Sequence, residues 1–317
     1  METIVAEQLF DPPSAGLKYL PEGPIWIGEQ RISWVAIQHA ADAEQGSLNI
    51  LDLATGENQS WQLPGRPGFA FPTQQAGVFL LGLERQLQQF DTATGEFRPL
   101  ADEVDAAVEG TIINDGISFA EGIVFGTKDL TFSEQKAGLY FWREADQQLI
   151  QLRDDQVCSN GKVIRQVAEN DWLLLDIDTP TQTVVQYRLD TAAGSLSPPD
   201  VVLDLTHLDI FPDGMVGTPD GQGVIIAFYN PQDAPFGVVH QYGLAEQDLQ
   251  IQWHLPGSPQ VTCPLLIERA GAVQLIATTA TENMPADKLA RYPMAGCLYA
   301  AATPHRVAPL DYKLPAR

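Results

Sequence analysis

Short apolar segments separated by polar turns follow one another along the chain, and the alternation of apolar and polar residues is typical of half-buried β-strands. A hairpin pattern, in which alternating apolar residues lead into a turn and a second strand, recurs along the chain. Its copies lie at residues 48–61, 87–100, 139–152, 184–196, 238–251 and 298–309. A helical pattern is found only at residues 285–292.

A short apolar strand precedes each hairpin, and these strands are predicted at residues 31–37, 76–83, 122–127, 172–177, 224–229 and 273–280. With one further strand in front of them, the repeats have four strands in roughly 40 to 50 residues, which is the pattern of a β-propeller. The sequence therefore predicts an all-β, six-bladed β-propeller that forms a single domain over residues 1–317. We expect the N-terminal strand, residues 4–9, to join the last blade beside residues 298–302 and close the ring.

A polar side chain followed by glycine, directly or one residue later, stands at the start of four of these repeats. The four side chains are Glu22, Asn114, Asn160 and Asp213. Each motif alone is also an ordinary turn signal. Because the first strand of a propeller blade lines the central channel, matched positions predict that the four side chains converge. Two carboxylates and two carboxamides suit Ca²⁺ or Mg²⁺ and, with water, Mn²⁺ or Zn²⁺.

Composition and charge limit the classes of partner. The chain has 18 Lys and Arg against 41 Asp and Glu, a formal net charge of -23. This charge repels nucleic-acid phosphates and anionic membrane surfaces, so we expect neither as a partner. The N-terminus has no signal-peptide pattern, and no window approaches about 18 consecutive apolar residues, which predicts a soluble, cytoplasmic protein. Cys158, Cys263 and Cys297 are too widely spaced for a metal-binding pair or a disulfide framework, so we expect reduced thiols.

Several short motifs together resemble the SMP-30/gluconolactonase/luciferin-regenerating-enzyme family of six-bladed propellers, over residues from about 20 to 302. They are EGPIW (22–26), NDG (114–116), FGT (125–127), SNG (159–161), DTPTQTVVQY (178–187), PDGM (212–215) and the block at 278–300. The resemblance implies one divalent cation held by Glu22, Asn160 and Asp213. Asn114 would stand beside the cation, as a ligand or as a group that binds substrate or water. Asp213 would also take a proton from the attacking water.

Two positions depart from the family pattern. The family's sugar-lactone hydrolases commonly carry arginine where this chain has Ile112, and often methionine where it has Lys128. Isoleucine offers no donor to sugar hydroxyls, so we expect a preference for a less hydroxylated lactone or ester. Lys128 could replace the arginine as an anchor for an anion or a carbonyl, or it could be an ordinary solvated lysine.

The resemblance implies a metal-dependent hydrolase of ester bonds, in the first place a lactonase that acts on a sugar lactone or another cyclic ester. A cation with an open position polarises a carbonyl and lowers the pKa of bound water. Ca²⁺ is the first choice, with Zn²⁺, Mn²⁺ and Mg²⁺ as alternatives. An organophosphate or aryl-ester hydrolase and a non-catalytic calcium- or ligand-binding propeller remain open. No GxSxG, HExxH or Walker motif points to other chemistry. The expected partner is a small lactone or ester, and the chain is expected to be a monomer or a homodimer.

Overall fold

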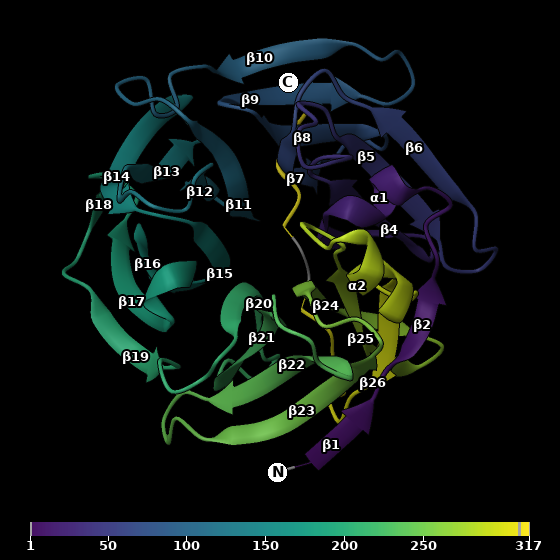
Figure 1. Ribbon diagram of the computed structural model, residues 1–317. Coiled ribbons are helices and arrows are strands. Elements are labelled where there is room, and N and C mark those ends of the chain that lie inside the picture. Colours follow the sequence, from purple (N-terminus) through teal and green to yellow (C-terminus); the bar gives the residue numbers. More distant parts are fainter. Residues whose placement is uncertain (1, 310–311, 317) are drawn as a thin grey trace. The chain divides into compact units, whose positions relative to one another are not determined.

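The computed structural model describes residues 2–309 and 312–316. In these residues the chain forms six β-sheets and two short α-helices, and it divides into two compact units. Figure 1 labels the elements along the chain. No helix of the described residues is long and apolar enough to cross a membrane.

The first unit comprises Met1–Arg66 and Leu208–Leu310. Its sheets have the strand orders β3-β4-β5-β6, β1-β23-β22-β21-β20 and β2-β26-β25-β24. The elements are β1 (Glu2–Val5), β2 (Glu7–Phe10), α1 (Ala15–Tyr19), β3 (Pro21–Gly28), β4 (Arg31–Ala36), β5 (Ser47–Asp52), β6 (Asn58–Gln62), β20 (Phe211–Gly217), β21 (Gly223–Tyr229), β22 (Phe236–Gly243), β23 (Leu249–Pro256), β24 (Val261–Arg269), β25 (Ala272–Thr279), α2 (Ala286–Arg291) and β26 (Leu298–Ala302).

The second unit comprises Pro67–His207 and Asp311–Arg317. Its sheets have the orders β10-β9-β8-β7, β11-β12-β13-β14 and β15-β16-β17-β18, and β19 also pairs with β17. The elements are β7 (Pro67–Pro72), β8 (Val78–Leu83), β9 (Gln86–Asp91), β10 (Phe97–Ala101), β11 (Thr111–Phe119), β12 (Gly122–Asp129), β13 (Ala137–Arg143), β14 (Gln148–Gln156), β15 (Ser159–Ala168), β16 (Asp171–Asp178), the 3₁₀ turn η1 (Thr179–Thr181), β17 (Thr183–Asp190), β18 (Ser195–Leu196) and β19 (Asp200–Asp204).

Strands that follow one another in the chain are antiparallel neighbours in each sheet, as in the blades of a β-propeller. The prediction of an all-β, six-bladed propeller is confirmed. The predicted apolar strands are the second strands β4, β8, β12, β16, β21 and β25. All residues of β8 and of β12 are buried, because these strands have a neighbouring strand on each side.

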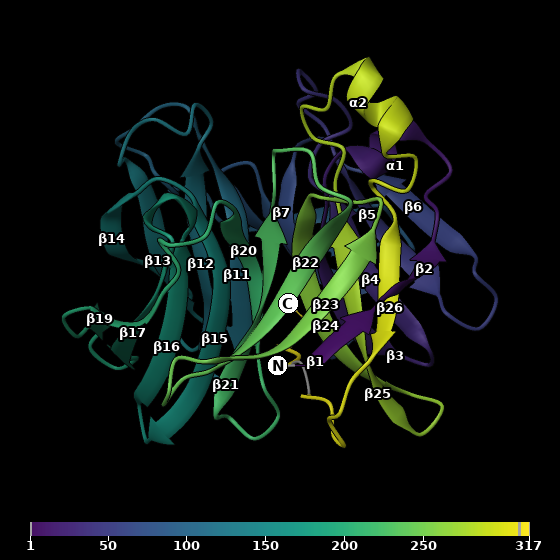
Figure 2. The same cartoon turned by 60° about the horizontal axis from the view of Figure 1, so that its bottom comes forward.

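The prediction that the N-terminal strand joins the last blade is confirmed by the pairing of β2 with β26, but the bounds of this strand differ from the prediction. The predicted N-terminal strand is divided at Ala6: β1 pairs in parallel with β23, and β2 pairs with β26 in antiparallel orientation (Figure 2). The prediction of a hairpin at residues 298–309 is wrong in its second half. Only its first strand, β26, forms, and β2 pairs with β26 where the second strand was expected. The segment after β26 contains Pro304 and Pro309, which have no N–H to donate to a β-ladder.

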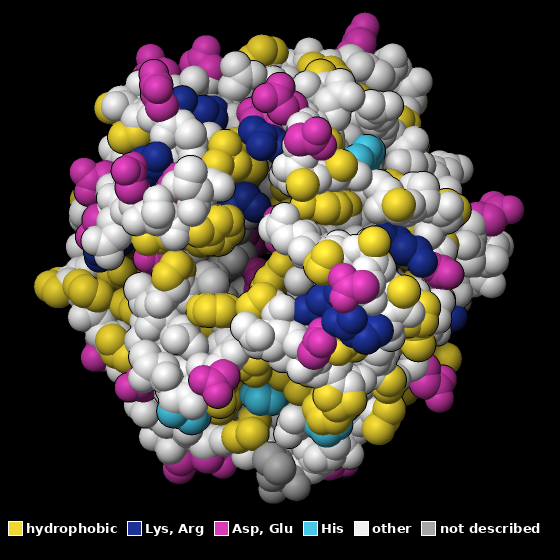
Figure 3. All heavy atoms as spheres, in the orientation of Figure 1, with side chains coloured by type: hydrophobic (Ala, Val, Ile, Leu, Met, Phe, Trp, Pro, Cys, Tyr) yellow, Lys and Arg dark blue, Asp and Glu magenta, His cyan; other side chains and the backbone are white. Residues whose placement is uncertain are grey.

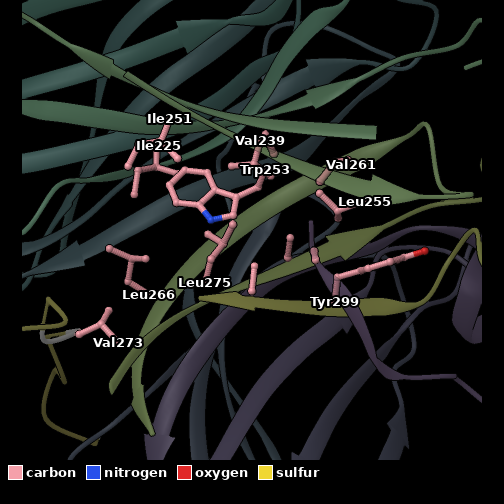
Figure 4. Close-up of a cluster of buried hydrophobic side chains, with 14 of the residues drawn as sticks. Ile225, Val239, Ile251, Trp253, Leu255, Val261, Leu266, Val273, Leu275 and Tyr299 are labelled. Atoms are coloured by element: carbon pink, nitrogen blue, oxygen red, sulfur yellow. The ribbon is translucent and has the colours of Figure 1, made fainter. Parts of the chain in front are cut away.

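Apolar side chains of adjacent sheets fill the space between them within each unit. In the first unit, Trp253 of β23 lies among Ile225, Val239, Leu266 and Leu275 of the two neighbouring sheets (Figure 4). The indole N–H of Trp253 donates to the carbonyl of Ala302 at 2.9 Å, so this large ring is buried without an unpaired donor.

The corresponding cluster of the second unit joins β11–β13 to β16 and β17. It contains Phe119, Val124, Leu139, Phe141, Trp172, Leu174, Tyr187 and Leu189. Burial of such apolar surface is the main favourable contribution to folding, at about 25 cal/mol per Å². The strands that bear the candidate site residues are therefore anchored by extensive packing in each unit.

Candidate functional site

Each sheet has a break in register near the beginning of its first long strand. The breaks lie between Glu22/Ile25, Pro67/Phe69, Ile113/Asp115, Asn160/Lys162, Pro212/Met215 and Val261/Pro264. A β-bulge turns a side chain away from the regular alternation and is frequent beside active sites. The polar residues singled out in the sequence lie in or at the edge of four of these breaks. The turn interpretation was wrong for Asn114-Asp115-Gly116, which lies inside the continuous strand β11.

In the second unit the structure brings Asn114 and Asn160 together. The Nδ2 of Asn114 donates to Oδ1 of Asn160 at 3.0 Å and to the carbonyl of Ser159 at 2.9 Å. The Nδ2 of Asn160 donates to the hydroxyl of Thr179 at 2.9 Å. These bonds orient both amides, with the oxygen of Asn160 toward Asn114. Within the described residues, no hydrogen bond uses Oδ1 of Asn114, which leaves this oxygen for a ligand.

A buried ion pair supports the backbone at Asn160. Nζ of Lys162 lies 3.1 Å from Oδ1 of Asp176 and donates to the carbonyl of Asn160 at 2.8 Å and to Oγ of Ser159 at 2.9 Å. Gln156 donates to the other carboxylate oxygen of Asp176 at 2.6 Å. Burial raises the pKa of Asp176, and Lys162 opposes this shift. The sequence analysis did not identify this network, which holds the bulged end of β15.

Cys158 was expected to be only a reduced thiol, and it lies directly against the two amides. Its sulfur accepts long contacts from Nδ2 of Asn114 at 3.7 Å and Nδ2 of Asn160 at 3.6 Å. The backbone N–H of Cys158 donates to Asp178 at 2.8 Å, so the carboxylate fixes the chain just before β15. Burial raises the pKa of Asp178, while hydrogen bonds from Cys158 and Val157 lower it. The sequence held one signal of this contact, since Cys158 stands only two residues before Asn160.

In the first unit, Glu22 and Asp213 lie on β3 and β20, and β24 is in contact with both strands. The hydroxyl of Thr262 in β24 donates to the carbonyl of Pro21 at 2.6 Å. On the other side, a Cβ added to Gly214 would lie only 2.7 Å from Sγ of Cys263, so β20 and β24 approach closely at the bulge. Glu22 and Asp213 are 9% and 8% exposed.

Tyr229 of β21 also lies in this unit. It faces Phe211 across β20 and β21, and its hydroxyl donates to the carbonyl of Glu282 at 3.4 Å. Burial raises the pKa of Tyr229, and the negative charges of Glu282 and Asp213 raise it further. The phenol therefore stays protonated, and its single O–H is directed to Glu282.

Ile112 and Lys128 are direct partners on β11 and β12. Both are buried, with 1% and 6% of their surface exposed. The interpretation of Lys128 as an ordinary solvated lysine is therefore wrong. The two departures from the family pattern occupy adjacent positions on one face of the sheet.

The donor chemistry of the predicted set fits a hard divalent cation, since it offers two carboxylates and two amide oxygens. Glu22 and Asp213 belong to one unit, and Asn114 and Asn160 to the other. Among the described residues, no group of three or more His, Cys, Asp or Glu side chains could hold a metal ion.

Comparisons with known proteins identify related sequences. The chain is 30% identical over 181 residues, or 56% of each chain, to a putative sugar lactone lactonase of Bacillus subtilis. It is 25% identical over 299 residues to a 6-deoxy-6-sulfogluconolactonase of Pseudomonas putida, covering 89% of this chain and 90% of that protein. The chain thus spans about half of the first relative and most of the second.

Solved structures show the same fold. A calcium-binding protein, regucalcin, from Agrobacterium tumefaciens has a TM-score of 0.80 at 20% identity and covers 98% of this chain and 99% of its own. A luciferin-regenerating enzyme also has a TM-score of 0.80, at 17% identity, and covers 99% of this chain and 100% of its own. The family model of the SMP-30/Gluconolactonase/LRE-like region matches residues 20–281, and the chain therefore belongs to this family.

Proposed function

We propose that this protein is a metal-dependent hydrolase that opens lactones. The observation that carries the proposal is the oriented pair of amides, in which Oδ1 of Asn160 lies 3.0 Å from Nδ2 of Asn114. Both amides are buried and lie at register breaks, where the family resemblance requires a cation ligand and its neighbour. The names of the two lactonase relatives support the same reaction.

We assign the cation ligands to Glu22, Asn160 and Asp213, with Asn114 in reach directly or through water. When bound, a divalent cation polarises the carbonyl of the lactone and stabilises negative charge on its oxygen. Ca²⁺ is the first choice because all donors are hard oxygens, with Zn²⁺, Mn²⁺ and Mg²⁺ as alternatives.

Side chains of the protein transfer the proton and orient the substrate. Asp213 accepts a proton from the attacking water and returns it to the oxygen that leaves the opened ring. Asn114 orients the substrate or the water through Oδ1, because its Nδ2 is already engaged.

Ile112 bears on the choice of substrate. Its buried side chain offers no donor where an arginine would offer several to sugar hydroxyls. Each hydroxyl left unpaired in a closed site costs about 1 to 3 kcal/mol, or roughly a 5- to 150-fold loss in kcat/KM. We therefore propose a preference for a lactone with fewer hydroxyl groups than gluconolactone.

Hydrolysis of a panel of lactones with and without a chelator tests the proposal. Aldonolactones, aliphatic lactones, aryl esters and phosphotriesters are assayed with Ca²⁺, Zn²⁺, Mn²⁺ or Mg²⁺ added back to the chelated protein. Lactone opening that chelation abolishes and one cation restores is the expected result. Turnover that survives exhaustive chelation, with no metal found by elemental analysis, contradicts metal dependence.

A non-catalytic calcium-binding protein is the second candidate, because one protein of the same fold is described as calcium-binding. This candidate predicts tight Ca²⁺ binding without turnover of any compound in the panel. Preferential turnover of aryl esters or phosphotriesters would instead indicate the esterase alternative. The same panel, combined with calcium titration calorimetry, separates these cases.

A further inference from the structure

Lys128 is a mostly buried lysine that forms no ion pair with an acidic side chain of the described residues. The residue is 6% exposed, and its Cα partners are Ile112 on β11 and Cys158 just before β15. Its ammonium lies 5.9 Å from the centre of the Phe132 ring, a weak cation–π contact. Among the described residues, no carboxylate forms an ion pair with Lys128. The stem of the side chain is buried and no carboxylate of the described residues neutralises its ammonium, so an anion from outside the chain is the natural complement.

The other two lysines between residues 67 and 207 are paired. Lys162 lies 3.1 Å from Asp176, and Lys136 lies 3.2 Å from Asp129 and 3.1 Å from Glu134. Asp176, Asp129 and Glu134 are therefore engaged with these two lysines.

Asp129, the next residue after Lys128, shows this most clearly. It accepts backbone N–H bonds from Thr131 at 3.2 Å, Ser133 at 2.9 Å and Glu134 at 3.0 Å. Burial favours the neutral acid, but these bonds outweigh it and hold the pKa of Asp129 well below its ordinary value. The carboxylate organises the loop that carries Phe132 and leaves Lys128 unpaired.

Lys128 lies beside the oriented amides of the same unit. Its Cα partner Cys158 contacts Nδ2 of Asn114 at 3.7 Å, and its other partner, Ile112, stands two residues before Asn114 on β11. Lys128 and Asn114 therefore lie on neighbouring strands of one sheet. The whole chain carries a formal net charge of -23, and acidic side chains are dispersed over the face shown in Figure 3. Lys128 is a local exception to a field that repels anions.

We infer that the substrate is an anionic lactone, with a carboxylate, sulfonate or phosphate group that pairs with Lys128 while the lactone carbonyl is attacked. This inference rests on the proposed lactonase function and adds the class of substrate. A desolvated charge-assisted hydrogen bond at this point makes the anionic lactone roughly 10- to 100-fold better in kcat/KM than its neutral analogue.

Two matched pairs of substrates test the inference. D-Glucaro-1,4-lactone differs from D-glucono-1,4-lactone by a carboxylate, and 5-oxotetrahydrofuran-2-carboxylate differs in the same way from γ-valerolactone. The wild-type protein is expected to favour the anionic member of each pair, mainly through KM. Equal or better turnover of the neutral members by the wild type overturns the inference, whatever any variant does.

Lys128→Met tests which residue is responsible, with Arg165→Met as a matched loss of one positive charge from the exposed face of β15. The ratio of kcat/KM values, anionic over neutral, should fall about 10-fold or more in Lys128→Met and stay as in the wild type in Arg165→Met. If Lys128 only supported the fold, both members of each pair would lose activity equally and the ratio would not change.

Binding of the ring-opened products separates failure of the inference from failure of the proposed function. Calorimetry with 2-hydroxyglutarate and 4-hydroxyvalerate, with chelator present, should show tighter binding of the former by the wild type and loss of this difference in Lys128→Met. If no lactone is opened but this binding pattern holds, the lactonase proposal fails and the anion site stands. If lactones are opened but neither substrates nor products show the preference, the anion site fails alone.

Discussion

Replacement of Lys162 by methionine is expected to destabilise the protein strongly, because it leaves the carboxylate of Asp176 buried without its counter-charge. The side chains of Lys162 and Asp176 are 0% and 2% exposed, so water cannot take the place of the lost ammonium. The amide of Gln156 at 2.6 Å is then the main remaining donor to Asp176. Removing one partner from a buried ion pair costs about 3 to 5 kcal/mol. The variant also loses the hydrogen bond to the carbonyl of Asn160.

Lys136→Met is the matched control, with the same substitution in the same unit. The side chain of Lys136 is 23% exposed, and its partner Asp129 keeps hydrogen bonds from Thr131, Ser133 and Glu134 after the lysine is removed. We expect a much smaller loss of stability for Lys136→Met, because Asp129 keeps these hydrogen bonds. Urea unfolding followed by tryptophan fluorescence gives both free energies, with the slopes compared to confirm that the same surface is exposed.

The double variant Lys162→Met/Asp176→Leu completes the test. When both charges are removed, the desolvation cost disappears with them, so much of the stability should return. A loss for Lys162→Met no larger than that for Lys136→Met, or a double variant less stable than the sum of the two single changes predicts, would refute the assignment of Lys162 and Asp176 as a coupled buried pair.

The remaining predictions concern activity and pH. Asp213→Asn should keep the circular dichroism spectrum and thermal unfolding of the wild type and lose turnover, because an amide cannot accept a proton from water; Asn114→Ala should reduce turnover more than cation occupancy, measured by titration calorimetry. Ile112→Arg should shift the ratio of kcat/KM values toward gluconolactone and away from an aliphatic lactone, and an unchanged ratio would show that this position does not contact the sugar. Burial, with the neighbouring His254, lowers the pKa of His240 to about 4. Since the folded pKa lies below the unfolded one, the unfolded state binds more protons between these values, and about 3 kcal/mol of stability should be lost as the pH falls from about 6.5 to 4. Urea unfolding across this range should show a smaller pH dependence in His240→Gln.

The repeated second strands could be predicted because each lies between two other strands of its sheet. Every residue of β8 and of β12 is buried, and such strands appear in the sequence as continuous apolar runs. The positions of the edge strands were harder to predict, because they depend on which sheet has an unpaired outer strand. The N-terminal segment contributes β1 to one sheet and β2 to another. At Ala6, between these strands, the backbone N–H donates to the carbonyl of His254 at 2.8 Å.

The candidate site could be predicted only as a set of residues. Polar side chains at matched repeat positions indicated Glu22, Asn114, Asn160 and Asp213, but glycine after a polar residue has the same appearance in a turn and in a bulge. Which of the two forms depends on the register of the partner strand. In β11 that register shifts between Ile113 and Asp115, which places Asn114 inside a bulged strand.

The same dependence on strand partners explains why Lys128 and Lys162 have different roles. Both are buried lysines on strands of the second unit. The Cα partner of Lys162 on the adjacent strand is Asp176, fourteen residues later in the chain, so its charge is neutralised within the fold. The Cα partner of Lys128 is Ile112, which offers no charge. A lysine that faces an acid across a sheet stabilises the protein, and one that faces an apolar side chain beside oriented amides keeps its charge for a ligand.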